Sequence, residues 1–347
     1  MRPTFSPRLV NDPFDDPGLF IPFLFQNRAI LFDLGDISAL SSREILNISH
    51  VFVSHTHMDH FAGFDRLLRL LIGRDKTLYV FGPRNFLKNV EGKLAGYTWN
   101  LVENYTGCLV LEAVEVHADT VLRRRYLCRN RFEPGKDAET AEFDGTLYRE
   151  TGLTISAVQL DHGIPCLAFT LQESFHVNIR PDALAALELQ PGPWLQSMKM
   201  ALYSGKSPET EITAETSGRS LPKKFRLADL TARIAIITPG QKVSYVADAG
   251  YTPKNAELIL AHIHHADHLF IEAAFADEHR DIARLKNHLT ARQAGTLAGL
   301  AQVKQFTPFH FSPRYTGRGH LLEAEARQAY QAALLLAKDT PAKGKVL

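Results

Sequence analysis

The stretch Ser54-His55-Thr56-His57-Met58-Asp59-His60 places three imidazoles and a carboxylate within six residues. It follows the apolar run Val51-Phe52-Val53 and precedes an apolar segment with helical spacing at residues 64–71. Imidazole and carboxylate are the ligands that zinc and similar divalent metals prefer. His55 and His57, two residues apart in an extended turn, can point the same way. The stretch therefore predicts a metal site at a turn between a strand and a helix.

Other polar side chains also lie beside runs that read as buried strands. The predicted strands are residues 45–53, 153–160, 242–247, 269–272 and 303–307, and helical segments alternate with them, which indicates a layered α/β fold. The polar residues at these ends are His55, His57, Asp59, His60, His162, Asp248, Glu272 and His310. This set could hold two metal ions if one carboxylate bridges them, and Asp248 is the natural bridge.

Two further residues, His288 and Asp33, are candidates for supporting this chemistry together with Glu272. Two divalent ions about 3.5–4 Å apart lower the pKa of a bridging water and neutralise charge that develops on a phosphoryl or acyl oxygen. The leaving oxygen still needs a proton, which His288 could give if Glu272 orients its ring. Asp33 follows a strand-like run at residues 28–32 and could either support the site or cap a helix.

Basic residues are concentrated in two places, although the whole chain of 347 residues carries a formal net charge of only +1. The run from Arg123 to Arg131 includes Arg123, Arg124 and Arg125 and suits either phosphate contact or protection of an exposed strand edge. Residues 176–232 are broken repeatedly by Pro and Gly and include Lys223 and Lys224. We interpret residues 176–232 as an arm inserted into a single domain that spans residues 1–347.

The cysteine content and the termini favour a cytoplasmic protein. Cys108, Cys128 and Cys166 show no paired spacing, which suggests a reducing compartment. The N-terminus lacks the apolar segment of a signal peptide, and no apolar run approaches the length needed to span a membrane. We therefore expect no membrane association.

The histidine-rich stretch resembles the signature of the metallo-β-lactamase superfamily, and other segments resemble its ribonuclease Z branch. These segments are Asp161-His162-Gly163-Ile164-Pro165, Val246-Ala247-Asp248-Ala249-Gly250, Phe270-Ile271-Glu272-Ala273-Ala274, His288-Leu289-Thr290-Ala291 and His310-Phe311-Ser312-Pro313. The resemblance runs from about residue 30 to residue 320 and keeps the family's motif order. It implies a four-layer αβ/βα sandwich, often dimeric, that cuts precursor tRNA on the 3′ side and leaves a 3′-hydroxyl.

The resemblance also implies roles for particular residues. One metal ion, most often zinc with manganese or iron as alternatives, would be held by His55, His57, His162 and Asp248. The second would be held by Asp59, His60, Asp248 and His310. Asp59 would also act as base on the attacking water, while Glu272 and His288 would serve the leaving group. The inserted arm would grip the tRNA, so RNA is the expected partner.

The opening loop at residues 11–18 departs from the glycine-rich loop of the family. Because such a loop would lie near the site, two functions stay open. The first is 3′ processing of precursor tRNA. The second is hydrolysis of a small phosphodiester, a cyclic nucleotide or an ester on the same fold.

Overall fold

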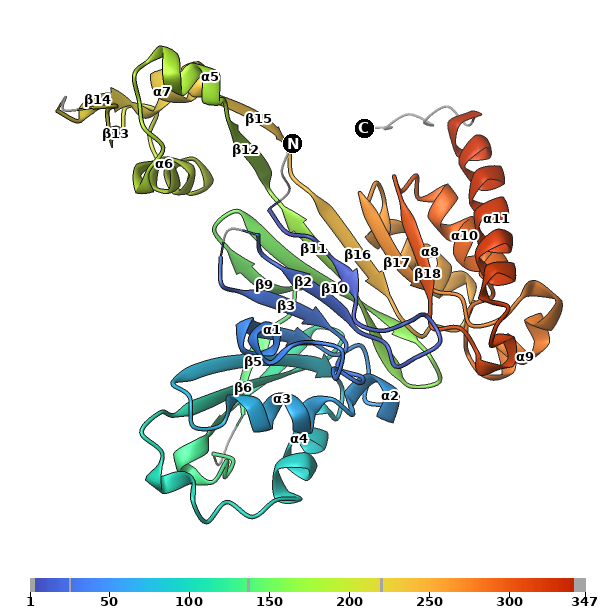
Figure 1. Ribbon diagram of the computed structural model, residues 1–347. Coiled ribbons are helices and arrows are strands. Elements are labelled where there is room, and N and C mark those ends of the chain that lie inside the picture. The colour runs from blue at the N-terminus through green and yellow to red at the C-terminus, as the bar shows by residue number, and fades with distance from the viewer. Residues whose placement is uncertain (1–3, 25, 136–137, 219–220, 340–347) are drawn as a thin grey trace. The chain divides into compact units, whose positions relative to one another are not determined.

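The computed structural model describes residues 4–24, 26–135, 138–218 and 221–339. The chain divides into two compact units. The larger unit comprises Phe5–Leu147, Ser156–Thr170 and Val243–Leu347, and the smaller comprises Met1–Thr4, Tyr148–Ile155 and Leu171–Lys242. Figure 1 labels the elements of both units.

An eight-stranded sheet forms one half of the larger unit, with its strands side by side in sequence order from β1 to β8. The pairs β3–β4, β4–β5 and β5–β6 are parallel, and the outer pairs are antiparallel. The strands are β1 (Arg8–Leu9), β2 (Leu19–Pro22), β3 (Ala29–Phe32), β4 (Ile48–Phe52), β5 (Lys76–Pro83), β6 (Leu109–Val116), β7 (Thr120–Leu127) and β8 (Glu139–Glu142).

A second sheet has six strands in the order β18-β17-β16-β11-β10-β9. The pairs β16–β17 and β17–β18 are parallel, so their carboxyl ends meet at one edge. The strands are β9 (Thr146–Glu150), β10 (Leu153–Asp161), β11 (Pro165–Glu173), β16 (Lys242–Val246), β17 (His268–Glu272) and β18 (Phe306–Phe309).

Aromatic side chains pack the two sheets of the larger unit face to face. The ring of Phe169 on β11 lies 5.2 Å from that of Phe32 and 5.8 Å from that of Phe52. Tyr245 on β16 lies 5.9 Å from Phe32. All four rings are buried, so the interface between the sheets is an apolar core.

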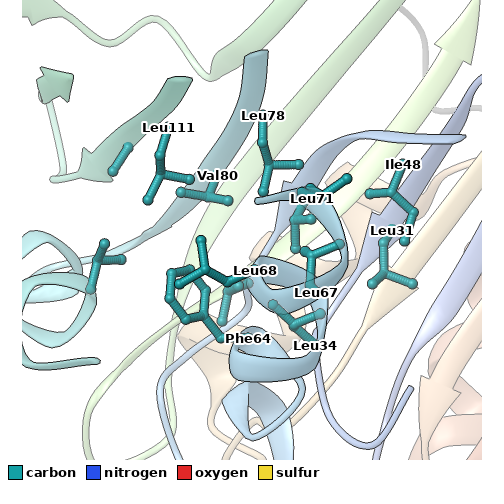
Figure 2. Close-up of a cluster of buried hydrophobic side chains, with 14 of the residues drawn as sticks. Leu31, Leu34, Ile48, Phe64, Leu67, Leu68, Leu71, Leu78, Val80 and Leu111 are labelled. Atoms are coloured by element: carbon teal, nitrogen blue, oxygen red, sulfur yellow. The ribbon is translucent and has the colours of Figure 1, made fainter. Parts of the chain in front are cut away.

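Helices cover the outer face of each sheet. Leu67, Leu68 and Leu71 of one helix pack with Leu31 and Val80 from the first sheet, as Figure 2 shows. The helices on this side are α1 (Ser42–Asn47), α2 (Met58–Phe61), α3 (Phe64–Leu71) and α4 (Phe86–Ala95). A separate core lies between the second sheet and the helices α8 (Pro253–Ile263), α10 (Ala291–Leu300) and α11 (Gly319–Asp339). Together the layers form the four-layer αβ/βα sandwich that the sequence predicted.

The prediction of one strand over residues 45–53 was wrong at its start. Residues 45–47 belong to α1, and β4 begins at Ile48. Ser41 accepts a hydrogen bond from the Glu44 amide, and the Glu44 side chain accepts one from the Ser41 amide. This capping box starts a short helix, so the apolar Ile45 packs in the core from a helix rather than from a strand.

The smaller unit has a core of its own. The antiparallel strands β12 (Phe175–Ile179) and β15 (Ala235–Pro239) enclose a segment in which Trp194, Met198 and Leu230 are buried together. That segment contains α5 (Pro181–Ala186), α6 (Pro193–Tyr203), β13 (Glu211–Ala214), β14 (Lys223–Arg226) and α7 (Leu227–Ile234). The predicted arm at residues 176–232 lies within this unit, and the paired strands around it extend from Phe175 to Pro239.

The described residues also form the helix α9 (Arg280–Leu285) and short 3₁₀ turns at η1 (Val102–Asn104), η2 (Cys128–Asn130), η3 (Asp277–His279) and η4 (Pro313–Tyr315). Among the described residues, no helix combines the length and the apolar character needed to cross a bilayer.

Candidate metal centre

Four of the predicted ligands form one group at the ends of β4, β10 and β16. The possible ligand atoms of His55, His57, His162 and Asp248 all lie within 4.8 Å of one another. The Nε2 atoms of His55 and His162 lie 3.7 and 3.5 Å from Asp248 Oδ2. His55, His162 and Asp248 are buried and His57 is exposed, so this group faces inward with one open side.

Three other predicted ligands form a second group. Asp59 Oδ2 lies 3.5 Å from His60 Nε2 and 3.2 Å from His310 Nε2. Asp248 connects the two groups, because its Oδ2 lies 3.5 Å from His60 Nε2 and its Oδ1 lies 2.9 Å from His310 Nδ1. Seven donors from four separate segments therefore converge, with one carboxylate between the two groups.

Several of these buried donor atoms have no hydrogen bond to other described residues. They are His60 Nε2, Asp248 Oδ1 and His310 Nδ1. A buried polar atom without a partner is costly unless a further group satisfies it. Asp248 Oδ1 and His310 Nδ1 lie 2.9 Å apart without forming a hydrogen bond, so donor atoms crowd together here unsatisfied, and the donor set fits divalent cations.

Asp33 supports this centre, which decides between the two alternatives that the sequence left open. It is fully buried, and its Oδ2 lies 2.8 Å from His60 Nδ1. The same carboxylate accepts hydrogen bonds from the Ser54 amide and hydroxyl at 2.6 and 2.9 Å and from the Tyr245 hydroxyl at 2.9 Å. A carboxylate on Nδ1 fixes the imidazole so that Nε2 faces the metal position. Tyr245 was not predicted, because nothing local in an apolar strand identifies its distant partner.

His162 is oriented by a second contact that the sequence did not predict. Its Nδ1 lies 2.8 Å from the backbone carbonyl oxygen of Asn287, which leaves Nε2 toward Asp248. The carbonyl belongs to the residue before His288, so one turn both orients His162 and presents His288. A backbone acceptor carries no signal in the sequence.

His288 and Glu272 lie together beside Asp248, as the sequence predicted. His288 Nδ1 lies 3.0 Å from Glu272 Oε2 and 3.9 Å from Asp248 Oδ2. The other oxygen of Glu272 accepts a hydrogen bond from the Ala249 amide at 2.7 Å. Burial alone would lower the pKa of His288, but the Glu272 carboxylate outweighs burial and the pKa is raised. Glu272 thus fixes both the His288 ring and the backbone directly after Asp248.

The ionisation of the centre suits cation binding. Burial lowers the pKa of His55 to about 2, and burial also lowers the pKa of His57, so both rings are neutral and able to bind metal. Burial would also lower the pKa of His310, but the carboxylates of Asp248 and Asp59 outweigh burial and raise the pKa of His310 to about 10. Burial would raise the pKa of Asp59, but His310 and His60 lower it. A cation in the second group would take the place of protons.

The five basic residues predicted to bind substrate lie outside both donor groups. Arg124 pairs with Glu91 at 2.5 Å and Arg125 with Glu112 at 3.2 Å, while Arg123 lies beside them on β7. On β14, Lys223 pairs with Glu188 at 3.4 Å and Lys224 with Glu211 at 2.7 Å. Four of the five thus already have a carboxylate partner, and their role in substrate binding stays a prediction.

A cavity of about 290 Å³ opens beside the second donor group. Asp59, His288 and His310 line it together with Phe14 and Asp15 of the opening loop. Burial is the main cause that raises the pKa of Asp16, a further lining residue, and the nearby Asp59 carboxylate adds to it. The altered opening loop therefore does lie at the candidate site.

The fold and the site together define a metallo-β-lactamase fold. A protein described as the metallo-β-lactamase fold protein YhfI from Bacillus subtilis superposes with a TM-score of 0.53 at 15% identity, covering 94% of each chain. No protein-family model matches the chain.

Sequence relatives narrow the class. The chain is 30% identical over 312 residues to a ribonuclease Z of Deinococcus radiodurans, covering 88% of this chain and 86% of the relative. It is 27% identical over 313 residues to a ribonuclease Z of Treponema denticola, covering 88% and 85%. The chain belongs to the ribonuclease Z family, as the motif order predicted.

Proposed function

We propose that this protein is an endoribonuclease that uses two metal ions to remove the 3′ trailer of precursor tRNA. The observation that carries the proposal is the position of Asp248 between two groups of donors, within 3.5 Å of both His162 and His60. Family membership supports the choice of substrate.

The residues present fit two divalent ions. His55, His57, His162 and Asp248 would hold one ion, and Asp59, His60, Asp248 and His310 would hold the other. Bound there, the ions would polarise a phosphoryl oxygen and lower the pKa of an attacking water. Imidazole-rich donors favour zinc, and manganese or iron are the alternatives.

Side chains of this chain supply the proton transfers. Asp59 is about two-fifths exposed and lines the cavity, so its carboxylate can take a proton from water that attacks phosphorus. The P–O3′ bond then breaks, and the oxygen that leaves needs a proton. His288 donates it from Nε2, since Nδ1 is held by Glu272. The products are a 3′-hydroxyl on the tRNA and a 5′-phosphate on the trailer.

The smaller unit would bind the body of the tRNA. Its inserted segment has a core of its own and carries Lys223, Lys224 and Arg226 on β14. Each of these three side chains is exposed and paired with a carboxylate, which a tRNA phosphate would have to displace. Phosphate contacts of this kind position a nucleic acid without reading its sequence.

We also propose a homodimer, which mass measurement in solution would test. The three cysteines are free, and a cytoplasmic location fits them.

The direct test is incubation of the purified protein with a precursor tRNA that carries a 3′ trailer, with zinc, manganese and iron supplied in turn. A single cut that leaves a 3′-hydroxyl is expected. Absence of cleavage with every metal would contradict the tRNA assignment. Turnover of bis(p-nitrophenyl) phosphate without tRNA cleavage would instead support a small-diester hydrolase, which the confined cavity beside Asp59 also favours.

A further inference from the structure

The opening loop is fixed in place beside the candidate metal centre. The Phe311 amide donates to the Pro13 carbonyl at 2.7 Å, and the Asn11 side chain donates to the carbonyls of Asp16 and Asp36 at 2.8 and 2.7 Å. These contacts join the loop to the chain at Asp36 and at Phe311, which lines the cavity. The cavity wall formed by the loop is therefore built before any substrate arrives.

Phe14 gives this wall an aromatic face. Its ring lies 5.3 Å from the ring of Phe311 at an angle of 78°, so Phe311 supports it edge-on. A Cβ atom on Gly319 would lie 2.9 Å from Phe14, so the absence of a side chain at Gly319 leaves space for the ring. Phe14 is only partly buried and remains available for stacking.

The side of the cavity formed by the opening loop is acidic. Asp15 and Asp16 line the cavity, and among the described lining residues Lys286 is the only lysine or arginine. Asp16 Oδ2 accepts the Asp36 amide at 3.2 Å, while Asp16 Oδ1 and the Asp15 carboxylate have no hydrogen bond to other described residues. Two carboxylates repel a second phosphate, but they accept hydrogen bonds from the amino and imino groups of a nucleobase.

We propose that this cavity is a nucleobase subsite, in which a base flanking the scissile phosphate stacks on Phe14 and donates hydrogen bonds to Asp15 and Asp16. The proposal rests on the proposed function, since it places the scissile phosphate at Asp59 and His310. At about 290 Å³ the cavity has room for a single nucleoside-sized group rather than a helical stem. Guanine fits best because adjacent N1–H and N2–H donors can meet carboxylate oxygens. Uracil fits worst because carbonyl oxygens flank its single N–H donor.

Two substrate sets test the subsite with the metal-loaded, full-length protein. One is a precursor tRNA with both nucleotides at the cleavage site randomised, read by sequencing of the products. The other is the set of sixteen dinucleoside monophosphates, which does not depend on tRNA binding. At one of the two positions, we expect substrates with guanine to have a kcat/KM about 5- to 100-fold higher than substrates with uracil.

Substitutions in the opening loop separate the two parts of the proposal. The double variant Asp15→Asn/Asp16→Asn exchanges carboxylate acceptors for amides that also donate, so the preference should move toward uracil and its carbonyl groups. Phe14→Leu should lower kcat/KM for all four bases by about tenfold without changing their order. Glu323→Gln removes an exposed carboxylate of the same unit outside this cavity and serves as the matched control.

The outcomes distinguish this proposal from the proposed function. A base preference among dinucleoside monophosphates without cleavage of precursor tRNA would support the subsite and reject the tRNA assignment. Cleavage of precursor tRNA with equal rates for all bases in both sets would reject the subsite alone. A guanine preference that persists in the double variant, with its melting temperature unchanged, would also overturn the subsite. Failure of the protein to hydrolyse both substrate sets would overturn it as well.

Discussion

Glu272 Oε2 lies 3.0 Å from His288 Nδ1, and the same carboxylate holds the Ala249 amide next to Asp248. This arrangement leaves His288 Nε2 free to protonate the leaving oxygen. His288→Ala should therefore lower kcat by about 10²- to 10⁴-fold while both metal ions stay bound. Single-turnover kinetics and elemental analysis measure the two quantities. His320→Ala, at an exposed position, is the control. An unchanged rate would show that His288 is not the acid.

Asp33 fixes the His60 ring, so Asp33→Asn should weaken metal binding rather than the chemical step. A loss of about 10- to 100-fold in affinity for one of two metal ions is expected. Tyr245→Phe removes one hydrogen bond to Asp33 and should have a smaller effect in the same direction. Titration calorimetry with zinc checks both variants, and equal affinity in wild type and Asp33→Asn would refute a positioning role.

The fold should lose stability on mild acidification because of His50. Burial, followed by the nearby Arg28 and Lys76, lowers the pKa of His50 from 6.5 to about 3. Between these values the unfolded chain binds a proton that the folded chain does not bind. Stability is therefore full above about pH 6.5 and falls as pH falls toward 3, by about 1.4 kcal/mol per pH unit.

His50→Phe isolates this contribution. The new ring can keep the stacking on Tyr79, whose ring lies 4.8 Å from that of His50. The free energy of unfolding, measured with urea between pH 6.5 and 4, should fall less steeply in the variant than in wild type. Parallel slopes would mean that His50 does not remain neutral in the folded protein.

Removal of residues 176–232 should affect the two substrate classes differently. Precursor tRNA loses its proposed contacts with the smaller unit, whereas a small diester needs only the metal centre. We expect tRNA cleavage to fall far more than hydrolysis of bis(p-nitrophenyl) phosphate. A short linker then joins Phe175 to Arg233. Equal losses on both substrates would indicate that the segment only supports the fold.

The donor residues could be found from sequence because each follows an apolar strand, and parallel strands bring such ends to one edge. Asp248 and His310 are far apart in the chain yet meet for this reason, because β16, β17 and β18 are parallel neighbours. The contacts that orient the donors could not be found. Tyr245 reaches Asp33 across 212 positions, and Asn287 acts through its carbonyl group.

Local patterns also misled at the start of two strands and stayed silent elsewhere. The strand predicted at residues 303–307 is β18 (Phe306–Phe309), so residues 303–305 lie outside it. The apolar Ile45 extended the predicted strand because the capping box at Ser41 and Glu44 was not weighed against it. Arg124 and Arg125 form a basic run in the sequence, but the partners that neutralise them, Glu91 and Glu112, come from other elements. Charge pairing across strands and helices depends on the fold and is not visible in a linear run.

The central claim is that one carboxylate, Asp248, joins two metal positions. Elemental analysis of the purified protein after saturation with zinc and removal of excess tests it most directly. We predict two equivalents per chain in wild type, and about one equivalent with activity abolished in His60→Ala. One equivalent in wild type, or two equivalents and full turnover in His60→Ala, would contradict the account.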